Sequence, residues 1–183
     1  MKNRTTWKEF KPALRFLLVF VASYFVGNVL YGLYVEAYNP LPDPMTVWVT
    51  VQVAQVLSTP EIPVSVLQST TEPIVWLVRD TKTILGIFEG CNGLNVVIVF
   101  ISFLVAFGGR VRVMVIYVVG GSLVLHAANL LRISLLYQTA LYRPLVFYYF
   151  HKYFFTAVLY FVVFALWFQW TRIKSSSRVS AKN

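Results

Sequence analysis

Four long apolar runs restrict the fold of this chain more than any other feature. A helix needs roughly twenty apolar residues to cross a bilayer core of about 30 Å. Runs of this length occupy 13–35, 84–107, 113–138 and 147–170. Because 58% of the residues are apolar and 13% are charged, the chain lacks the charged surface of a soluble domain. We therefore expect one integral membrane domain over 1–183, an all-α polytopic transmembrane helical bundle of about four spans.

Basic residues predict how these spans are oriented. The formal net charge is +9, and lysine and arginine gather at both ends of the chain and in one short turn. Because cytoplasmic loops are enriched in lysine and arginine, we expect residues 1–12, the hinge 108–112 and the basic tail 171–183 to be cytoplasmic. The acidic segment 36–83 and the loop 139–146 are then external. Four spans with both termini cytoplasmic satisfy all of these assignments.

The same composition bears on partners and cofactors. A basic balance is typical of nucleic-acid binding, but the basic residues are nearly absent from the apolar runs, as in membrane proteins. We therefore expect membrane lipid, and no nucleic acid, among the partners. One cysteine and two distant histidines are too few ligands for a metal site, so we expect no metal. The sequence also has no glycine-rich phosphate loop, and we expect no cofactor.

The external segment 36–83 contains one apolar stretch that is too short to span. Residues 45–57 are MTVWVTVQVAQVL, in which valine alternates with other residues as it does in a strand. A strand alone in lipid would leave its backbone groups unpaired. A short interfacial or re-entrant element is therefore the preferred interpretation. The structure of the remainder of 36–83 stays open.

Three side chains with reactive or charged groups lie near the external ends of three different spans. Cys91 follows the start of the second span, Arg132 precedes the end of the third, and His151 opens the fourth. At about 1.5 Å per residue, Cys91 is expected roughly 10 Å below the external surface, at a depth similar to that of Arg132. An arginine within a span is costly unless it is paired or hydrated, so Arg132 is the strongest single indication of a site.

Each of these residues also has a purely structural interpretation. A lone cysteine is usually a small buried apolar side chain, and solvation explains a histidine at a membrane interface. Cys91, however, is flanked by glycines and polar residues, and two polar residues precede Arg132 on its span. The residues expected to bind substrate or to support the site are Glu89, Asn92, Asn95, His126 and Asn129.

Together the three side chains suit acyl transfer. A cysteine attacks as the thiolate, which requires a lowered pKa or a neighbouring base. A histidine accepts the proton, and a guanidinium stabilises the thiolate or the developing oxyanion. Arginine also keeps its charge in a poorly hydrated site. We therefore expect Cys91 to be the nucleophile, His151 the general base and acid, and Arg132 the oxyanion stabiliser.

Three blocks of the sequence resemble the exosortase and archaeosortase family of membrane cysteine transpeptidases. They are GCNGLN at 90–95, HAANLLRI at 126–133 and FHKYFFTAVLY at 150–160. The resemblance covers the chain after Lys82 and is greatest to the exosortase F branch, although many exosortases are much longer. It implies the same three catalytic residues and cleavage of hydrophobic C-terminal sorting tails on exported proteins, through a thioester on Cys91.

The resemblance also implies a location and a second substrate. The site would face outward from a bacterial cytoplasmic membrane, because the sorting tails belong to exported proteins. The acyl group would pass from the thioester to an acceptor that the sequence does not identify. Hydrolysis by water and transfer to that acceptor both stay open.

Two other classes of function stay open from the residues alone. A small transporter or channel subunit would line a polar path with Arg132, His126 and Asn129. The inner halves of the last two spans are nearly all apolar, which disfavours such a path. A non-catalytic assembly partner would use the same polar residues to bind another membrane protein. Replacing Cys91 separates these classes, because only the enzyme requires the thiol.

Overall fold

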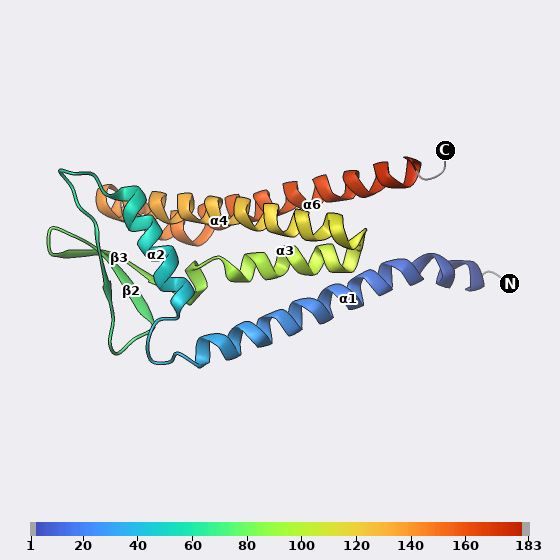
Figure 1. The fold of residues 1–183 in the computed structure, drawn as a ribbon, viewed down its shortest axis with the longest axis horizontal. Coiled ribbons are helices and arrows are strands. Elements are labelled where there is room, and N and C mark those ends of the chain that lie inside the picture. The colour runs from blue at the N-terminus through green and yellow to red at the C-terminus, as the bar shows by residue number, and fades with distance from the viewer. Residues whose placement is uncertain (1–2, 181–183) are drawn as a thin grey trace.

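The computed structural model consists of a helical bundle and a smaller cap that covers one end of it (Figure 1). It describes the backbone of residues 3–180 and the side chains of residues 10–174, so the outermost parts of both predicted cytoplasmic ends lie outside the described residues. The cap, residues 44–88, contains one helix and three strands. In chain order the elements are α1 (Asn3–Glu36), α2 (Pro44–Leu57), β1 (Ser65–Gln68), β2 (Ile74–Arg79), β3 (Lys82–Phe88), η1 (Glu89–Cys91), α3 (Leu94–Phe107), α4 (Val111–Tyr142), α5 (Pro144–Tyr149), η2 (Phe150–Phe154) and α6 (Phe155–Ser180).

Three helical segments are long and apolar enough to cross a membrane. They are Phe10–Glu36, Val111–Tyr142 and Pro144–Lys174, and they contain the first, third and fourth predicted spans. The last segment joins α5, η2 and α6. Figure 1 shows both chain ends on the side of the molecule opposite the cap. The prediction of long apolar helices is therefore confirmed for three of the four runs, and these three could span a membrane.

The second predicted span, 84–107, is not one helix. Its first residues belong to β3, the chain then forms the short turn η1, and only α3 is an apolar helix. Since α3 has 14 residues, its length is about 21 Å, which is less than the thickness of a bilayer core. Cys91 consequently lies at the junction between the sheet and α3, and not inside a spanning helix as the sequence predicted.

A three-stranded antiparallel sheet corrects the all-α prediction. Its strand order is β1-β2-β3, and β2 joins β3 through a tight loop at Asp80 and Thr81, both with positive φ. Positive φ at both loop residues is typical of the turns that match the twist of a hairpin. The sheet turns one apolar face toward the bundle, and the residues buried on it are Val75, Leu77, Leu85 and Ile87.

The valine-rich stretch at 45–57 is the helix α2, although its alternation is typical of a strand. The Asp43 side chain accepts hydrogen bonds from the backbone N–H groups of Met45 and Thr46, and Pro44 occupies the first turn. Both features stabilise a helix start. The buried residues follow helical spacing, and they are Thr46, Val49, Thr50, Val53 and Ala54. The short element is therefore a helix that lies within the cap.

The predicted external loop, 139–146, is mostly helical. The helix α4 continues to Tyr142, α5 begins at Pro144, and Arg143 alone separates them. Proline disfavours a helical conformation in the residue before it, and it fits the first position of the next helix. The chain therefore turns at one residue, which keeps the end of α4 close to the start of the last helical segment.

The molecule has two hydrophobic cores. The cap core lies between the cap and the ends of α4 and α6, and its members include Val49, Leu77, Cys91, Ile133 and Phe155. The bundle core lies among α3, α4 and α6, and its buried members are Phe100, Leu104, Leu125, Val163 and Trp170. Only the cap core contains a reactive side chain.

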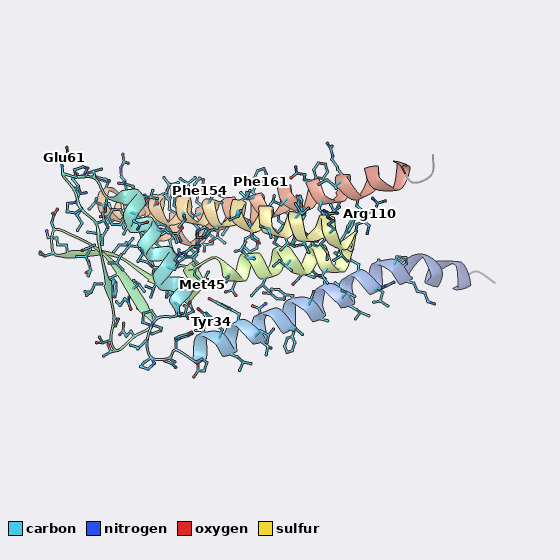
Figure 2. All side chains as sticks on the ribbon, in the orientation of Figure 1. Tyr34, Met45, Glu61, Arg110, Phe154 and Phe161 are labelled. Carbon is cyan, nitrogen blue, oxygen red and sulfur yellow. The ribbon has the colours of Figure 1, made fainter. Side chains whose placement is uncertain are left out.

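Acidic and basic residues mark opposite ends of the molecule. Figure 2 shows Glu61 at the cap end and Arg110, in the turn between α3 and α4, at the far end. Figure 2 also shows Tyr34 and Met45 together where α1 meets α2. The Tyr34 hydroxyl accepts a hydrogen bond from the Met45 backbone N–H at 3.3 Å. The predicted external segment and the basic hinge thus occupy different ends of the bundle.

Candidate active site

Cys91 ends the turn η1, directly after β3. Its side chain is 5% exposed and belongs to the cap core, and it forms no disulfide. Burial raises the pKa of the Cys91 thiol, while the Arg132 guanidinium and a hydrogen bond with the Phe88 backbone partly oppose this rise. A desolvated thiol forms its thiolate only with help from a neighbouring group. The cation at Arg132 is such a group.

Asn129 of α4 fixes the loop around Cys91, residues 89–93. Its Nδ2 donates a hydrogen bond to the Cys91 carbonyl oxygen at 2.9 Å, and the Asn129 side chain is 1% exposed. Gly93 has φ +87°, and a Cβ atom there would lie 3.1 Å from Cγ of Asn129. The positive φ and the close approach both favour glycine. The conformation of the Cys91 loop is therefore set by its packing against α4.

Arg132 lies three residues after Asn129, on the same face of α4. Its Nη1 donates to Asn129 Oδ1 at 3.3 Å, and its Nε is buried without a hydrogen-bond partner among the described residues. The guanidinium acts electrostatically on both the Cys91 thiol and the His151 imidazole. No carboxylate within residues 10–174 forms an ion pair with it. A function explains this costly charge better than packing does.

His151 lies in the π-helical turn η2, between α5 and α6. Its ring stacks on Phe147, with 5.7 Å between the ring centroids. Turns of this kind occur frequently at functional sites. No hydrogen bond joins His151 to Cys91 in the part of the chain whose side chains are described. The charge of Arg132 acts on both residues, and within residues 10–174 this is the one interaction that Cys91 and His151 have in common.

Asn92 holds the Cys91 loop to α1 and α2. Its Nδ2 donates to the Tyr31 hydroxyl at 2.9 Å and to Thr46 Oγ1 at 3.3 Å, and its Oδ1 accepts from the Leu94 backbone N–H at 3.0 Å. The Tyr31 hydroxyl in turn donates to the Glu89 carbonyl oxygen at 2.8 Å. Because these bonds engage both ends of the amide, Asn92 acts as a structural link.

Two other residues predicted to support the site have a buried oxygen without a hydrogen-bond partner among the described residues. Oε2 of Glu89 and Oδ1 of Asn95 are buried and have no hydrogen-bond partner among the described residues. Buried polar atoms in proteins are normally paired, so an unpaired one requires a reason. Glu89 belongs to the Cys91 loop, and Asn95 follows it in the first turn of α3.

His126 contacts α2 and not the Cys91 loop. Its Nε2 lies 2.9 Å from Gln52 Oε1, and its ring stacks on Trp48 with 4.8 Å between centroids. Beside this pair lies a groove of about 370 Å³, between α2, α3 and α4. The groove reaches Gly93 of the Cys91 loop, and most of its lining is apolar. His126, which was predicted to support the site, therefore lies at the edge of this groove.

The sequence prediction missed three residues that organise the site. Tyr31 and Thr46 hold Asn92, and Asp43 accepts a hydrogen bond from the Thr46 hydroxyl at 2.5 Å. Nothing marks Tyr31 within an apolar run that is rich in aromatic residues. The pair Asp43 and Pro44, by contrast, is a recognisable helix start that would have placed Thr46 on a buried helix face.

Comparisons with family models, with curated proteins and with solved structures find no match to this chain. The likeness of its three sequence blocks to membrane transpeptidases therefore rests on the residues themselves. The hydrogen bonds that connect Arg132, Asn129 and the Cys91 loop are an observation independent of that likeness.

Proposed function

We propose that this protein is a membrane cysteine peptidase or transpeptidase that cleaves the C-terminal sorting tails of exported proteins. One observation carries the proposal. Arg132 of α4 acts electrostatically on both Cys91, from η1, and His151, from η2. Arg132 is also linked to the Cys91 loop through Asn129, which accepts from its Nη1 and donates to the Cys91 carbonyl oxygen. A cation held in this way can stabilise the negative charge that develops during acyl transfer. Three distant parts of the sequence thus contribute to one site.

The first step forms a thioester. Sγ of Cys91 attacks the carbonyl carbon of the scissile peptide bond, and the thiol proton passes to His151. The carbonyl oxygen becomes an oxyanion, which the Arg132 guanidinium stabilises. When the C–N bond breaks, the nitrogen of the released tail takes the proton from His151. The N-terminal part of the substrate stays bound to Cys91 as a thioester.

The second step releases the product. An acceptor amine or water attacks the thioester carbonyl and gives a proton to His151, again through an oxyanion beside Arg132. When the C–S bond breaks, the Cys91 sulfur recovers the proton. An amine acceptor yields a new amide, and water yields a carboxylic acid. Catalytic hydrogen bonds often tighten only when substrate binds, so we expect the proton path between Cys91 and His151 to close at that stage.

Asn129 supports this chemistry as a positioning residue. It accepts a hydrogen bond from Arg132 and donates one to the Cys91 carbonyl oxygen. The amide thereby fixes the guanidinium relative to the backbone that carries the thiol. Arginine suits this place better than lysine, because its planar group keeps the charge and offers several donors at once.

The position of the site supports a membrane-embedded substrate. The Cys91 loop lies where the cap meets the bundle, and the apolar groove beside it suits the hydrophobic part of a sorting tail. Both chain ends lie opposite the cap (Figure 1). If the basic ends are cytoplasmic, the site faces outward, where exported proteins are processed. We place the protein in a bacterial cytoplasmic membrane on the family resemblance.

The test is made in the native host. Intact masses of exported proteins with hydrophobic, basic C-terminal tails are compared between the wild type and a Cys91→Ala strain. We expect a set of proteins to keep its tails only in the Cys91→Ala strain, and the new C-terminus in the wild type gives the cleavage position. Ser102→Ala is the matched control, because Ser102 is buried in α3 and bonded to its own helix.

Equal processing in all three strains would overturn the proposal. In that outcome Cys91 is a packing residue, and the chain is better pursued as a transporter subunit or an assembly partner. Loss of processing in both variants, together with loss of the protein from the membrane, would show a folding defect. Cys91→Ser, which keeps size and polarity, then replaces Cys91→Ala in the comparison and is also expected to be inactive.

A further inference from the structure

A second cavity lies at the end of the molecule opposite the cap. It has a volume of about 1200 Å³, is open on one side, and is lined by α1, the end of α3 and the end of α6. Its lining combines basic side chains with apolar ones, and the residues that matter here are Lys11, Arg15, Phe16, Val19, Val105 and Lys174. The cavity is larger than the roughly 300–1,000 Å³ that is usual for small-molecule sites.

Two cations on α1 face this cavity. Lys11 and Arg15 are four residues apart, so they lie on the same side of the helix, one turn from each other. Both side chains are exposed, and neither forms an ion pair with another residue in 10–174. None of the described residues that line the cavity is acidic. Among the residues whose side chains are described, none neutralises the charge of this wall by an ion pair.

A third cation comes from α6. The Nζ atom of Lys174 donates a hydrogen bond to the Phe107 carbonyl oxygen at the end of α3, and it lies 4.5 Å from the centroid of the Phe107 ring. These contacts hold the Lys174 ammonium at the cavity wall. Lysine and arginine side chains from two helices thus border one cavity.

The apolar part of the lining is equally specific. Phe16 and Val19 continue along α1 from Arg15, and Val105 lies opposite on α3. The cavity therefore has a basic part toward the chain ends and an apolar part toward the middle of the bundle. An anionic phospholipid has the matching division, because its phosphate is charged and its acyl chains are apolar.

We propose that this cavity binds one anionic phospholipid, with its phosphate among Lys11, Arg15 and Lys174 and an acyl chain along Phe16 and Val19. The site is independent of the peptidase site, which lies at the other end of the molecule. A bound lipid would contact α1, α3 and α6 together at the end of the bundle that the cap does not cover. It also presents negative charge next to a part of the chain that is otherwise strongly basic.

The experiment uses the purified full chain in a mild detergent and native mass spectrometry. Dioleoyl phosphatidylglycerol and dioleoyl phosphatidylcholine, which share acyl chains but differ in net charge, are titrated separately. We expect one phosphatidylglycerol to bind more tightly than phosphatidylcholine. The variant Lys11→Gln/Arg15→Gln should weaken phosphatidylglycerol about fivefold for each charge removed, or about 25-fold in total.

The matched control removes two exposed cations at the same end of the molecule. Arg112→Gln/Arg172→Gln changes the net charge equally, but neither residue lines the cavity. This control should bind phosphatidylglycerol as the wild type does. A second variant, Val19→Trp, fills the apolar part and should weaken both lipids while it leaves all three cations in place.

Four outcomes would overturn the inference. Equal affinity for the two lipids would exclude recognition of charge, and equal loss in the two double variants would show only a general attraction to basic protein. Displacement of phosphatidylglycerol by inorganic phosphate at millimolar concentration would assign the site to a free phosphate. Failure of Val19→Trp to weaken either lipid would exclude the acyl-chain contact.

Discussion

The two hydrophobic cores of this molecule differ in the polar groups that lie next to them. The bundle core is made of aromatic and aliphatic side chains that interlock among three helices. The cap core contains Cys91, and it adjoins the buried amide of Asn129 and the partly buried guanidinium of Arg132. Both regions contain buried polar atoms without a partner among the described residues, such as Nε1 of Trp170 in the bundle core and Nε of Arg132 beside the cap core. Only the region of the cap core combines a thiol with a cation, so the proposed function places chemistry and packing at opposite ends of the long axis. Substitutions in the two cores should then separate them.

The largest effect on stability is expected in the bundle core. Phe100 is 0% exposed, and its ring packs closely against Gly121 of α4. Phe100→Ala leaves a cavity and should lower the free energy of unfolding by about 3–5 kcal/mol. The measurement is unfolding of the detergent-solubilised protein, with cleavage of a tail peptide measured per folded molecule.

The control for this substitution is Phe161→Ala, because Phe161 is 72% exposed on α6. It should change the free energy of unfolding by no more than about 0.5 kcal/mol. The rate of cleavage per folded molecule should equal that of the wild type in both variants. A lower rate in folded Phe100→Ala would show that the two cores are coupled and that packing and chemistry are not separated.

The next effect concerns the cap core, and here the rate of cleavage should change while the free energy of unfolding does not fall. Arg132→Gln removes the proposed oxyanion stabiliser and should lower the rate of tail cleavage about 10²–10³-fold, which is about 2.7–4 kcal/mol. The free energy of unfolding should not fall, because a charge without an ion pair within the span is removed. Initial rates and unfolding curves are measured on the same preparations.

Arg143→Gln is the corresponding control, since Arg143 is an exposed arginine at the break between α4 and α5. It should retain the wild-type rate. If Arg132→Gln instead unfolds as easily as Phe100→Ala, and its folded fraction cleaves normally, then Arg132 is a structural residue and the proposed mechanism is wrong.

The smallest effect is a shift in the pH dependence of Cys91. Burial raises the pKa of its thiol, and Arg132 lowers it in part. Because only the thiolate reacts, alkylation by iodoacetamide should accelerate as pH rises, with a midpoint above the value of about 8.5 for a free cysteine. Arg132→Gln removes the opposing effect and should move the midpoint to still higher pH. Alkylation is measured by intact mass, with glutathione as the reference thiol. A midpoint for Cys91 below that of glutathione would contradict this assignment.

The long helices were predictable because they depend on a strong local signal. Runs of twenty apolar residues have few alternatives to a helix. A cation such as Arg132 inside one of these runs requires a partner or a function, and the structure gives it Asn129 as a hydrogen-bond partner. The catalytic grouping of Arg132 with Cys91 and His151 stays a prediction.

The cap was not predictable from the same signals. Residues 84–88, ILGIF, have no polar side chain, and periodicity does not distinguish a buried strand from a buried helix in so short a segment. The strand β3 is selected by pairing with β2, which is a tertiary contact. The stretch at 45–57 shows the reverse case, because the capping by Asp43 and a buried face with helical spacing override its alternating valines.

The single turn between α3 and α4 divides the residues of the candidate site unequally. The segment before it supplies Cys91, and the segment after it supplies Asn129, Arg132 and His151. Neither half of the chain holds a complete candidate site, and the hydrogen bond from Asn129 to the Cys91 carbonyl oxygen is one of the links between them. If the proposed function holds, cleavage activity is a direct measure of tertiary assembly: the two halves, inserted separately into the same bilayer, should be inactive until they associate.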